Sequence, residues 1–300
     1  MARCLVTGHR GYIGSRLYAE LKKQGHEVQG IDIKPNDRGL DGHDINTVLS
    51  QDSGGKFHPH FYNFNPEYIF HLACIPRVAY SVENPVETML NNVMCTTNVL
   101  NFARKVGTKR VIYSGSSSVV GNGDGPTSPY GLQKLISEME SKLYSDLYGV
   151  DTVTLRYFNV YSKDQKAEGP YATAISNWMR FIREGKEPFI TGDGEQRRDM
   201  LHVSDAVAAN IFAMNSDEPF CGTTFDAGTG TNISLNEVKK IVKEYFPEVN
   251  FKYVDERPGD VMLTRANTVP LAQRGWTVNV SVEEGISDCF KNLKKELENE

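Results

Sequence analysis

The sequence has few of the features that mark a nucleic-acid-binding or membrane protein. No cluster of basic residues stands out, and the net charge of −5 is unfavourable for a nucleic-acid surface, which needs a concentrated basic face. No apolar run reaches the length of a membrane span, and Met1-Ala2-Arg3 leads directly into an expected strand. We therefore predict no nucleic acid, no membrane partner and no signal peptide. A small anionic substrate remains compatible with this charge, because single arginines can bind phosphate.

Cysteine is scarce, and its spacing argues against two further classes of protein. The five cysteines are an odd number and none is spaced as CxxC, so neither a disulfide framework nor a zinc site is predicted. They are Cys4, Cys74, Cys95, Cys221 and Cys289. The stretch Phe57-His58-Pro59-His60 lacks a neighbouring Cys, Asp or Glu cluster, so we predict no metal. Reduced thiols indicate a cytoplasmic protein.

Short apolar segments alternate with helical segments through the first half of the chain. The expected strands are 4–6, 28–31, 68–72, 110–114 and 152–157, and the expected helices are 13–24, 86–105 and 129–148. This alternation predicts an α/β fold with a Rossmann-type doubly wound parallel sheet, built from residues 1–160 with a later part, about 200–230, returning to it. Residues 161–300 are less regular, and we expect them to form mainly a smaller, interleaved substrate-binding α/β domain.

The less regular half still shows short elements between glycine-rich breaks. The expected helices are 170–184, 204–214, 235–245 and 281–297, and the expected strands are 189–190 and 224–226. In the earlier helix 129–148, an apolar stripe is expected to pack while Tyr130 and Lys134 lie on a different face and line a cleft. The stripe consists of Leu132, Leu135, Ile136, Met139 and Leu143.

A glycine-rich loop joins the first expected strand to the first helix. Gly8, Gly11 and Gly14 permit a tight turn and allow the backbone to approach a pyrophosphate at the helix N-terminus. Asp32 ends the second strand, 18 residues past Gly14, where a carboxylate can accept from both ribose hydroxyls. A carboxylate there repels a 2′-phosphate, so NAD is favoured over NADP. Arg10 and Lys34 lie close enough in sequence to keep NADP as the alternative.

Tyr130 and Lys134 are spaced as a catalytic acid/base pair. A phenol has a pKa near about 10 and is a poor base at neutral pH. An ammonium one helical turn away lies on the same face and favours the phenolate. With Ser116 upstream and oxidised nicotinamide nearby, Tyr130 is predicted to take a proton from an alcohol while hydride leaves the same carbon.

With these motifs the chain resembles the extended short-chain dehydrogenase/reductases, and among them the nucleotide-sugar epimerases related to UDP-glucose 4-epimerase. The resemblance covers nearly the whole chain and is carried by further stretches that are more specific than the glycine loop. They are His71-Leu72-Ala73, residues 92–98, Arg156-Tyr157-Phe158-Asn159-Val160-Tyr161, residues 192–199, His202-Val203-Ser204-Asp205, Arg257-Pro258-Gly259-Asp260 and Gly275-Trp276.

The resemblance implies the residues of a cofactor site and a substrate site. The implied NAD site consists of Gly8, Gly11, Tyr12, Ile13, Gly14, Asp32, Asp44, Ile45, Leu72, Ala73, Asn92, Tyr130, Lys134, Tyr157 and Phe158. The implied substrate site consists of Ser116, Asn159, Arg198, Arg257 and Thr264. Guanidinium groups suit the diphosphate, because they bind its oxygens in a bidentate way. Arg197 is expected in a surface ion pair, and His71 and His202 are expected to be structural hydrogen-bonding residues.

The residues after Ser116 bear on the reaction. Relatives that dehydrate or decarboxylate are expected to carry acidic residues at the next two positions, where this chain has Ser117 and Ser118. Epimerisation needs only Tyr130, Ser116, Lys134 and NAD, and proceeds through a transient keto-sugar. The alternatives are a nucleotide-sugar 4-ketoreductase or related dehydrogenase, and a non-catalytic protein on the same fold.

The resemblance also suggests the sugar and the oligomeric state. A small Thr264 would leave room for an N-acetyl group at C2, so a UDP-N-acetylhexosamine is plausible beside a UDP-hexose. The helices from Val86 and from Pro129 have more apolar surface than one sheet face needs, which predicts a homodimer. The chain departs from the family pattern at Gln133, where a small residue usually precedes the lysine, at Val120, and in a shortened segment between Ser116 and Tyr130.

Overall fold

The computed structural model describes residues 1–34, 43–76, 78–121, 123–165, 173–256 and 261–299. These residues form two compact units. Unit 1 comprises Met1–Val119, Ser128–Arg156 and Val207–Phe225, and unit 2 comprises Val120–Thr127, Tyr157–Ala206 and Asp226–Glu300. None of the described helices combines the length and the hydropathy that a membrane span requires. All five cysteines are free thiols, as predicted.

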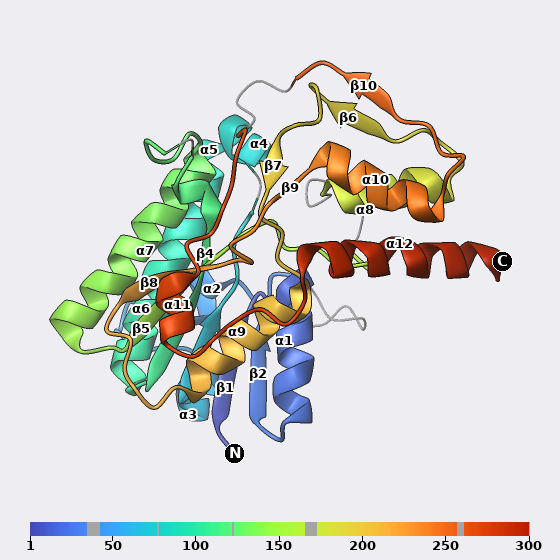
Figure 1. Cartoon of the computed structure of the whole chain (residues 1–300). Helices are drawn as coiled ribbons and strands as arrows, with labels where there is room; N and C mark the ends of the chain where they lie inside the picture. The colour runs from blue at the N-terminus through green and yellow to red at the C-terminus, as the bar shows by residue number, and fades with distance from the viewer. Residues whose placement is uncertain (35–42, 77, 122, 166–172, 257–260, 300) are drawn as a thin grey trace. The chain divides into compact units, whose positions relative to one another are not determined.

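Unit 1 is built on a six-stranded sheet with the order β2-β1-β3-β4-β5-β8. The strands are β1 (Arg3–Thr7), β2 (Glu27–Ile31), β3 (Tyr68–His71), β4 (Arg110–Ser116), β5 (Thr152–Tyr157) and β8 (Thr223–Ala227). The pairs β1–β2, β1–β3 and β3–β4 are parallel. The predicted Rossmann-type α/β fold is therefore confirmed (Figure 1).

The strand order reverses direction between β1 and β3. From β1 the chain moves through α1 (Tyr12–Lys23) to β2, whereas from β3 it moves the other way through α6 (Cys95–Val106) to β4 and α7 (Pro129–Tyr148) to β5. Right-handed crossovers in opposite directions place their helices on opposite faces of the sheet. The crevice at the carboxyl ends of β1 and β3 is the topological switch point, where such sheets bind their ligands.

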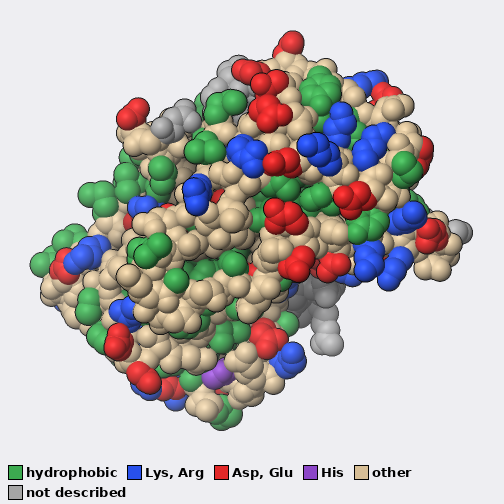
Figure 2. Space-filling view, in the orientation of Figure 1, with side chains coloured by type: hydrophobic (Ala, Val, Ile, Leu, Met, Phe, Trp, Pro, Cys, Tyr) green, Lys and Arg blue, Asp and Glu red, His purple; other side chains and the backbone are tan. Residues whose placement is uncertain are grey.

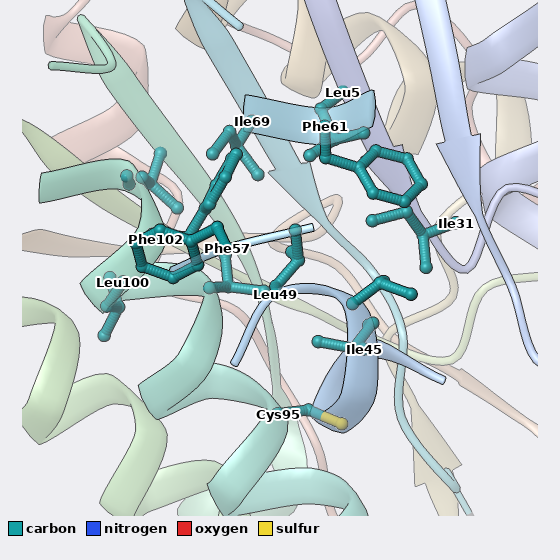
Figure 3. Close-up of a cluster of buried hydrophobic side chains, with 14 of the residues drawn as sticks. Leu5, Ile31, Ile45, Leu49, Phe57, Phe61, Ile69, Cys95, Leu100 and Phe102 are labelled. Carbon is teal, nitrogen blue, oxygen red and sulfur yellow. The ribbon is translucent and has the colours of Figure 1, made fainter. Parts of the chain in front are cut away.

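The core of unit 1 forms because the central strands are apolar on both faces. Leu5, Ile31 and Ile69 from three neighbouring strands are fully buried and meet aromatic side chains from outside the sheet, including Phe61 and Phe102 (Figure 3). Phe61 lies on α3 (Pro59–Phe64), and the short helix α2 (Ile45–Val48) closes the same cluster. Burial of this kind fixes the strand ends, and with them the loops at the switch point.

The predicted continuous helix 86–105 is wrong in one respect, because the structure divides it. The segment begins in α5 (Pro85–Met89), which follows α4 (Val78–Glu83). It then passes through a π-helical turn at Leu90–Met94 and only after that continues as α6. A π-helical turn widens the helix by one residue and often marks a functional site. Asn92 lies in the middle of this turn and is buried.

Helix α7 buries the opposite face from the one that its apolar stripe suggested. Its buried residues are Tyr130, Gly131, Gln133, Lys134, Ser137, Glu138 and Ser141. Three residues of the predicted stripe, Leu132, Met139 and Leu143, are exposed to solvent instead. Polar side chains can face the sheet because they have partners there: Glu138 accepts three hydrogen bonds of 2.8–3.1 Å from the Arg156 guanidinium on β5. Figure 2 shows exposed hydrophobic side chains over the region of α7.

Unit 2 has its own core and two small sheets. Strand β6 (Phe189–Thr191) pairs with β10 (Lys252–Val254) in parallel, and β7 (Arg197–Arg198) pairs with β9 (Ile233–Ser234) in antiparallel fashion. The helices are α8 (Ala174–Arg183), α10 (Leu235–Tyr245), α11 (Val269–Gln273) and α12 (Val282–Glu298), and α9 (Val203–Asn215) connects the two units. Trp178 and Phe290 anchor the core.

Candidate active site

The glycine loop after β1 is held tightly enough that side chains are excluded from it. Gly8 has a φ of +71°, its N–H donates to the carbonyl of Ile31 at 2.7 Å, and its carbonyl accepts from the Gly11 N–H at 2.9 Å. A Cβ on Gly14 would lie 2.1 Å from the Gly8 oxygen, and a Cβ on Gly8 would lie 2.9 Å from the Ala73 nitrogen. Only glycine satisfies both approaches.

This loop brings the N-terminus of a helix, with the N–H groups of its first turn, to the switch point. Helix α1 starts at Tyr12, followed by Ile13, and its N-cap Gly11 has no side chain that could accept from the first turn. Those N–H groups and the helix dipole favour a phosphate. The loop therefore fits the pyrophosphate of a dinucleotide, because its glycines allow the tight turn that leads into the helix N-terminus.

Asp32 lies directly after β2 and faces the glycine loop. Its carboxylate accepts from the Arg10 N–H at 2.9 Å and from the Lys34 N–H at 3.0 Å. These two bonds orient the acid and leave lone pairs for ribose hydroxyls. Asp44 caps α2, with its side chain accepting from the Asn46 N–H at 2.9 Å, while the Ile45 side chain belongs to the core. Contacts of Asp44 and Ile45 with adenine stay a prediction.

The N-terminal part of α7 carries the two catalytic candidates and lies against β4. Ser128 caps the helix by accepting from the Gly131 N–H, and Pro129 stands at the first helical position, so the helix begins where the motif begins. The Lys134 ammonium donates to the Ser114 carbonyl at 2.7 Å, and lies 6.0 Å from the centre of the Tyr130 ring. Tyr130 and Lys134 are 8% and 3% exposed.

The electrostatics of Tyr130 differ from the sequence-based expectation of a phenolate. Burial raises the pKa of Tyr130 to about 12, even though the Lys134 ammonium and a hydrogen bond with Ser116 both lower it. Burial outweighs a single buried cation, so the protein alone holds the phenol protonated at neutral pH. Burial also lowers the pKa of Lys134, but Cys74, Tyr113 and Tyr130 outweigh that effect and raise it above its usual value.

Ser116, the third catalytic candidate, lies at the end of β4. Its hydroxyl donates to the Ser118 hydroxyl at 3.1 Å and accepts from the Ser118 N–H at 3.2 Å. Ser116, Tyr130 and Lys134 thus lie near one another within unit 1. The roles assigned to each of them stay predictions.

His71 is a structural hydrogen-bonding residue, as predicted. It is buried at the end of β3, with Nδ1 2.8 Å from the Thr7 hydroxyl and Nε2 3.1 Å from the Thr96 hydroxyl. Burial, together with the Lys134 charge, lowers the pKa of His71 to about 3. The ring is therefore neutral. Leu72 and Ala73 follow it, and their N–H groups donate to the Thr7 carbonyl at 3.3 Å and the Thr7 hydroxyl at 3.2 Å.

The substrate candidates of unit 2 are organised by a carboxylate that the sequence did not single out. Asp199 is fully buried and accepts from the N–H groups of Thr229, Gly230 and Ala266 at 2.8–3.0 Å. Its own carbonyl accepts from the Asn159 amide at 2.7 Å. Three separate backbone segments are therefore fixed around one acid. Only its place in the 192–199 stretch could have drawn attention to it.

Asn159 and Thr264 are brought together beside Asp199. The Asn159 amide donates to the Thr264 hydroxyl at 3.3 Å, and Asn159 has a positive φ of 32°. That φ is unusual for a residue other than glycine and indicates local backbone strain at Asn159. Tyr157 and Phe158 precede it and are buried.

The structure describes two of the three arginines for which the sequence made a prediction. Arg198 lies half-buried on β7 and donates to the Arg197 carbonyl at 3.1 Å. Arg197 is bonded to Asn232 and forms the expected ion pair, at 2.8 Å, with Glu237. Arg257 lies outside the described residues. The assignment of Arg198 and Arg257 to a diphosphate stays a prediction.

The fold and the glycine loop define a class of protein: an enzyme that binds a dinucleotide at the switch point of a doubly wound sheet. Residues 4–228 match the model of the NAD dependent epimerase/dehydratase family. The chain is 31% identical to the UDP-N-acetyl-alpha-D-glucosaminuronate decarboxylase of Bacillus cytotoxicus, over 99% of both chains. It is 29% identical to the UDP-glucose 4-epimerase of Mycolicibacterium smegmatis, over 97% of this chain and 99% of the relative.

Solved structures with a similar fold include members of the same group of enzymes. The UDP-glucose 4-epimerase of Thermotoga maritima, solved with UDP-glucose, superposes with a TM-score of 0.86 at 28% identity, covering 98% of this chain and 99% of that one. The chain belongs to the NAD dependent epimerase/dehydratase family. It is an NAD-dependent enzyme of the epimerase type, and the predicted cofactor and family resemblance are confirmed.

Proposed function

We propose that the protein epimerises a nucleotide-diphosphate sugar, most plausibly a UDP-hexose or UDP-N-acetylhexosamine at C4, through a transient keto-sugar with Tyr130 as acid and base. One observation carries the proposal: Tyr130 and Lys134 are buried together on one face of α7, where Lys134 and Ser116 both lower the pKa of the phenol against the effect of burial. A buried phenol next to a fixed ammonium is suited to exchange one proton with a substrate hydroxyl.

In the proposed mechanism the protein residues handle protons and position. Tyr130 accepts the proton of the sugar hydroxyl, and Ser116 holds that hydroxyl or relays its proton. Bound NAD supplies the hydride acceptor and, in the reverse direction, the hydride donor. Lys134 stabilises the phenolate and would hold the nicotinamide ribose of the bound cofactor. The oxidised nicotinamide brings a positive charge that would add to that of Lys134 against the effect of burial.

The same residues then complete the inversion. The keto-sugar turns about its diphosphate link and is reduced on its opposite face, while Tyr130 returns the proton. Asn159, Arg198 and Arg257 are the proposed ligands of the nucleotide diphosphate, which stays bound during this rotation. Thr264 is proposed to limit the space at C2 of the sugar, and its hydroxyl accepts from Asn159 and from the Asp199 N–H at 3.1 Å.

Ser117 and Ser118 favour epimerisation over elimination or decarboxylation. Loss of water needs a second group that protonates the departing hydroxyl, and a serine hydroxyl is a poor acid for that step. The Ser118 hydroxyl accepts a hydrogen bond from the Ser116 hydroxyl. The second candidate function is a 4-ketoreductase or dehydrogenase that uses the same three residues. It differs only in consuming cofactor.

The test is a panel of nucleotide sugars followed by proton NMR. We expect the purified protein to interconvert one C4 pair, UDP-glucose with UDP-galactose or their N-acetyl counterparts, in preference to GDP-, dTDP- or CDP-sugars. In D₂O no deuterium should appear at C4, because the hydride returns to the same sugar. Stoichiometric consumption of reduced cofactor would identify the reductase, and a stable deoxy or decarboxylated product would contradict the proposal.

A further inference from the structure

Gln133 precedes Lys134 on α7 but points into the protein. Its side chain is 0% exposed, and both ends of its amide are bonded. Oε1 accepts from the Asn92 Nδ2 at 2.8 Å, and Nε2 donates to the Thr88 hydroxyl at 2.9 Å. The residue therefore joins the catalytic helix to α5 and to the π-helical turn.

The orientation of the Gln133 amide is dictated by Thr88. The Thr88 hydroxyl gives its proton to backbone carbonyls, with Asn84 at 3.0 Å and Pro85 at 3.2 Å. It can therefore only accept from Gln133, so Nε2 must face Thr88 and Oε1 must face Asn92. Because the Gln133 Oε1 can only accept, the Asn92 side chain must turn its amino group, Nδ2, toward it.

In this orientation the Asn92 side chain forms two hydrogen bonds with the backbone of Ile75. Its Oδ1 accepts from the Ile75 N–H at 2.7 Å, and its Nδ2 donates to the Ile75 carbonyl at 3.3 Å as well as to Gln133. If the Asn92 amide turned over, its oxygen would face the Gln133 oxygen and both bonds to Ile75 would be lost. Gln133 thus decides which way Asn92 points.

A second chain of buried hydrogen bonds, through Thr96, His71 and Thr7, holds Ala73. Ala73 and Ile75 are the two ends of the segment 73–75. Thr96 gives its proton to the Asn92 carbonyl at 2.8 Å, so His71 must donate to Thr96 through Nε2 and accept from Thr7 at Nδ1. The Thr7 hydroxyl accepts from the Ala73 N–H at 3.2 Å. Residues 73–75 are held at both ends, and Ala73 lies against Gly8 of the dinucleotide loop.

We propose that Gln133 is a positioning residue: through the Asn92 amide it fixes the segment from Ala73 to Ile75 beside Gly8, and so sets the affinity for NAD. The inference rests on the proposed assignment of the glycine loop as the NAD site. A long amide is needed at this position, because the side chain must span from α7 to both Asn92 and Thr88.

The test is a double-mutant cycle on NAD⁺ binding, measured by calorimetry on the full chain freed of co-purified nucleotide. Gln133→Met keeps the length of the side chain and removes both hydrogen bonds, and should weaken NAD⁺ binding about tenfold. In an Asn92→Ala background the same substitution should change the dissociation constant by less than about twofold, because the path through Asn92 is already gone. Equal effects in both backgrounds would overturn the proposal.

Thr152→Val is the matched control for a purely structural loss. It removes a buried hydrogen bond of 2.8 Å from the Thr152 hydroxyl to the Ser141 carbonyl on the same helix, away from Asn92. It should lower the melting temperature and leave the NAD⁺ dissociation constant unchanged. If Gln133→Met behaves in the same way, the positioning role is excluded.

Thr88 supplies a second route if Gln133→Met fails to fold. Thr88→Ser keeps the hydroxyl and should retain the NAD⁺ affinity, whereas Thr88→Val should lower it, and equal affinities would contradict the proposal. The readout contains no sugar, so its failure is separable from that of the proposed function. A wild-type protein without epimerase activity would defeat the function and leave this inference standing.

Discussion

Tyr130 is subject to opposing influences on its pKa, and the balance explains why the residue needs its neighbours. Burial favours the neutral phenol, while Lys134 and Ser116 favour the phenolate. A phenol that stays protonated until the site is loaded would act as a base only when the substrate and the charged cofactor are both present. The proposed acid/base function therefore depends on Tyr130 and Lys134 together.

Tyr130→Phe removes the proton-transferring group and little else. We expect NAD binding to persist and the rate of sugar interconversion to fall at least about 100-fold, the low end of the loss expected for a general acid/base. Steady-state rates and calorimetric titration with NAD⁺ check the two parts separately. Turnover near the wild-type value would contradict the assignment of Tyr130.

His71 should make the protein sensitive to acid. Its pKa is lowered to about 3 in the folded protein, whereas an unfolded histidine titrates near about 6.5. The unfolded chain therefore binds a proton first as the pH falls. The stability contributed by neutral His71 is complete above about pH 6.5 and is lost between about 6.5 and 3, at up to about 1.4 kcal/mol per pH unit.

The measurement is urea unfolding of the wild type and of His71→Asn between pH 7 and pH 5. Asparagine does not titrate, so the free energy of unfolding should fall about 2 kcal/mol further in the wild type over this range. The starting stability of the variant is irrelevant, because only the slopes are compared. Parallel slopes would show that His71 is already charged or accessible in the folded protein.

At the scale of elements, the sequence predicted the limits of α7 but not its buried face. Ser128, Pro129 and the left-handed Gly149 carry local signals for the start and end of a helix, and the structure has it at Pro129–Tyr148. Hydrophobic periodicity identifies an apolar face but does not say whether it packs inside one chain. The polar face is buried instead because Glu138 has a partner in Arg156, a distant residue.

The π-helical turn was not predictable for the same reason. Nothing in residues 90–94 alone disfavours an α-helix, and the turn depends on Asn92 reaching Ile75 and Gln133, which are remote in the sequence. The candidate site was partly predictable: the motifs carried Ser116, Tyr130 and Lys134. Gln133 and Asp199 were missed as site-organising residues, because their roles come from contacts that only the fold creates.

At the scale of the whole molecule, unit 1 leaves a large apolar surface uncovered. The exposed residues include Val82 on α4, Val86 on α5, and Leu90 and Met94 in the π-helical turn. On α7 they include Leu132, Met139, Leu143 and Leu147. Monomeric proteins rarely expose a continuous apolar surface of this kind. We propose that a second copy of the chain covers it in a homodimer.

Sedimentation of the wild type should give a dimer at micromolar concentration. Met139→Glu combined with Leu143→Glu should shift the protein to monomer, because two charges would be buried without partners. Val269→Glu is the matched control, since Val269 is similarly exposed but lies on α11, outside this surface. A wild type that sediments only as a monomer would end the proposal.

The interleaving of the two units has a consequence for how the protein is made. Unit 1 is interrupted twice, and its last segment is Val207–Phe225, which carries the beginning of β8 next to β5 in the sheet. A nascent chain emerging from the ribosome therefore cannot complete this sheet until that segment has left the exit tunnel. Until then the edge of β5 remains open to pairing with other chains, so prematurely terminated copies would be prone to aggregate.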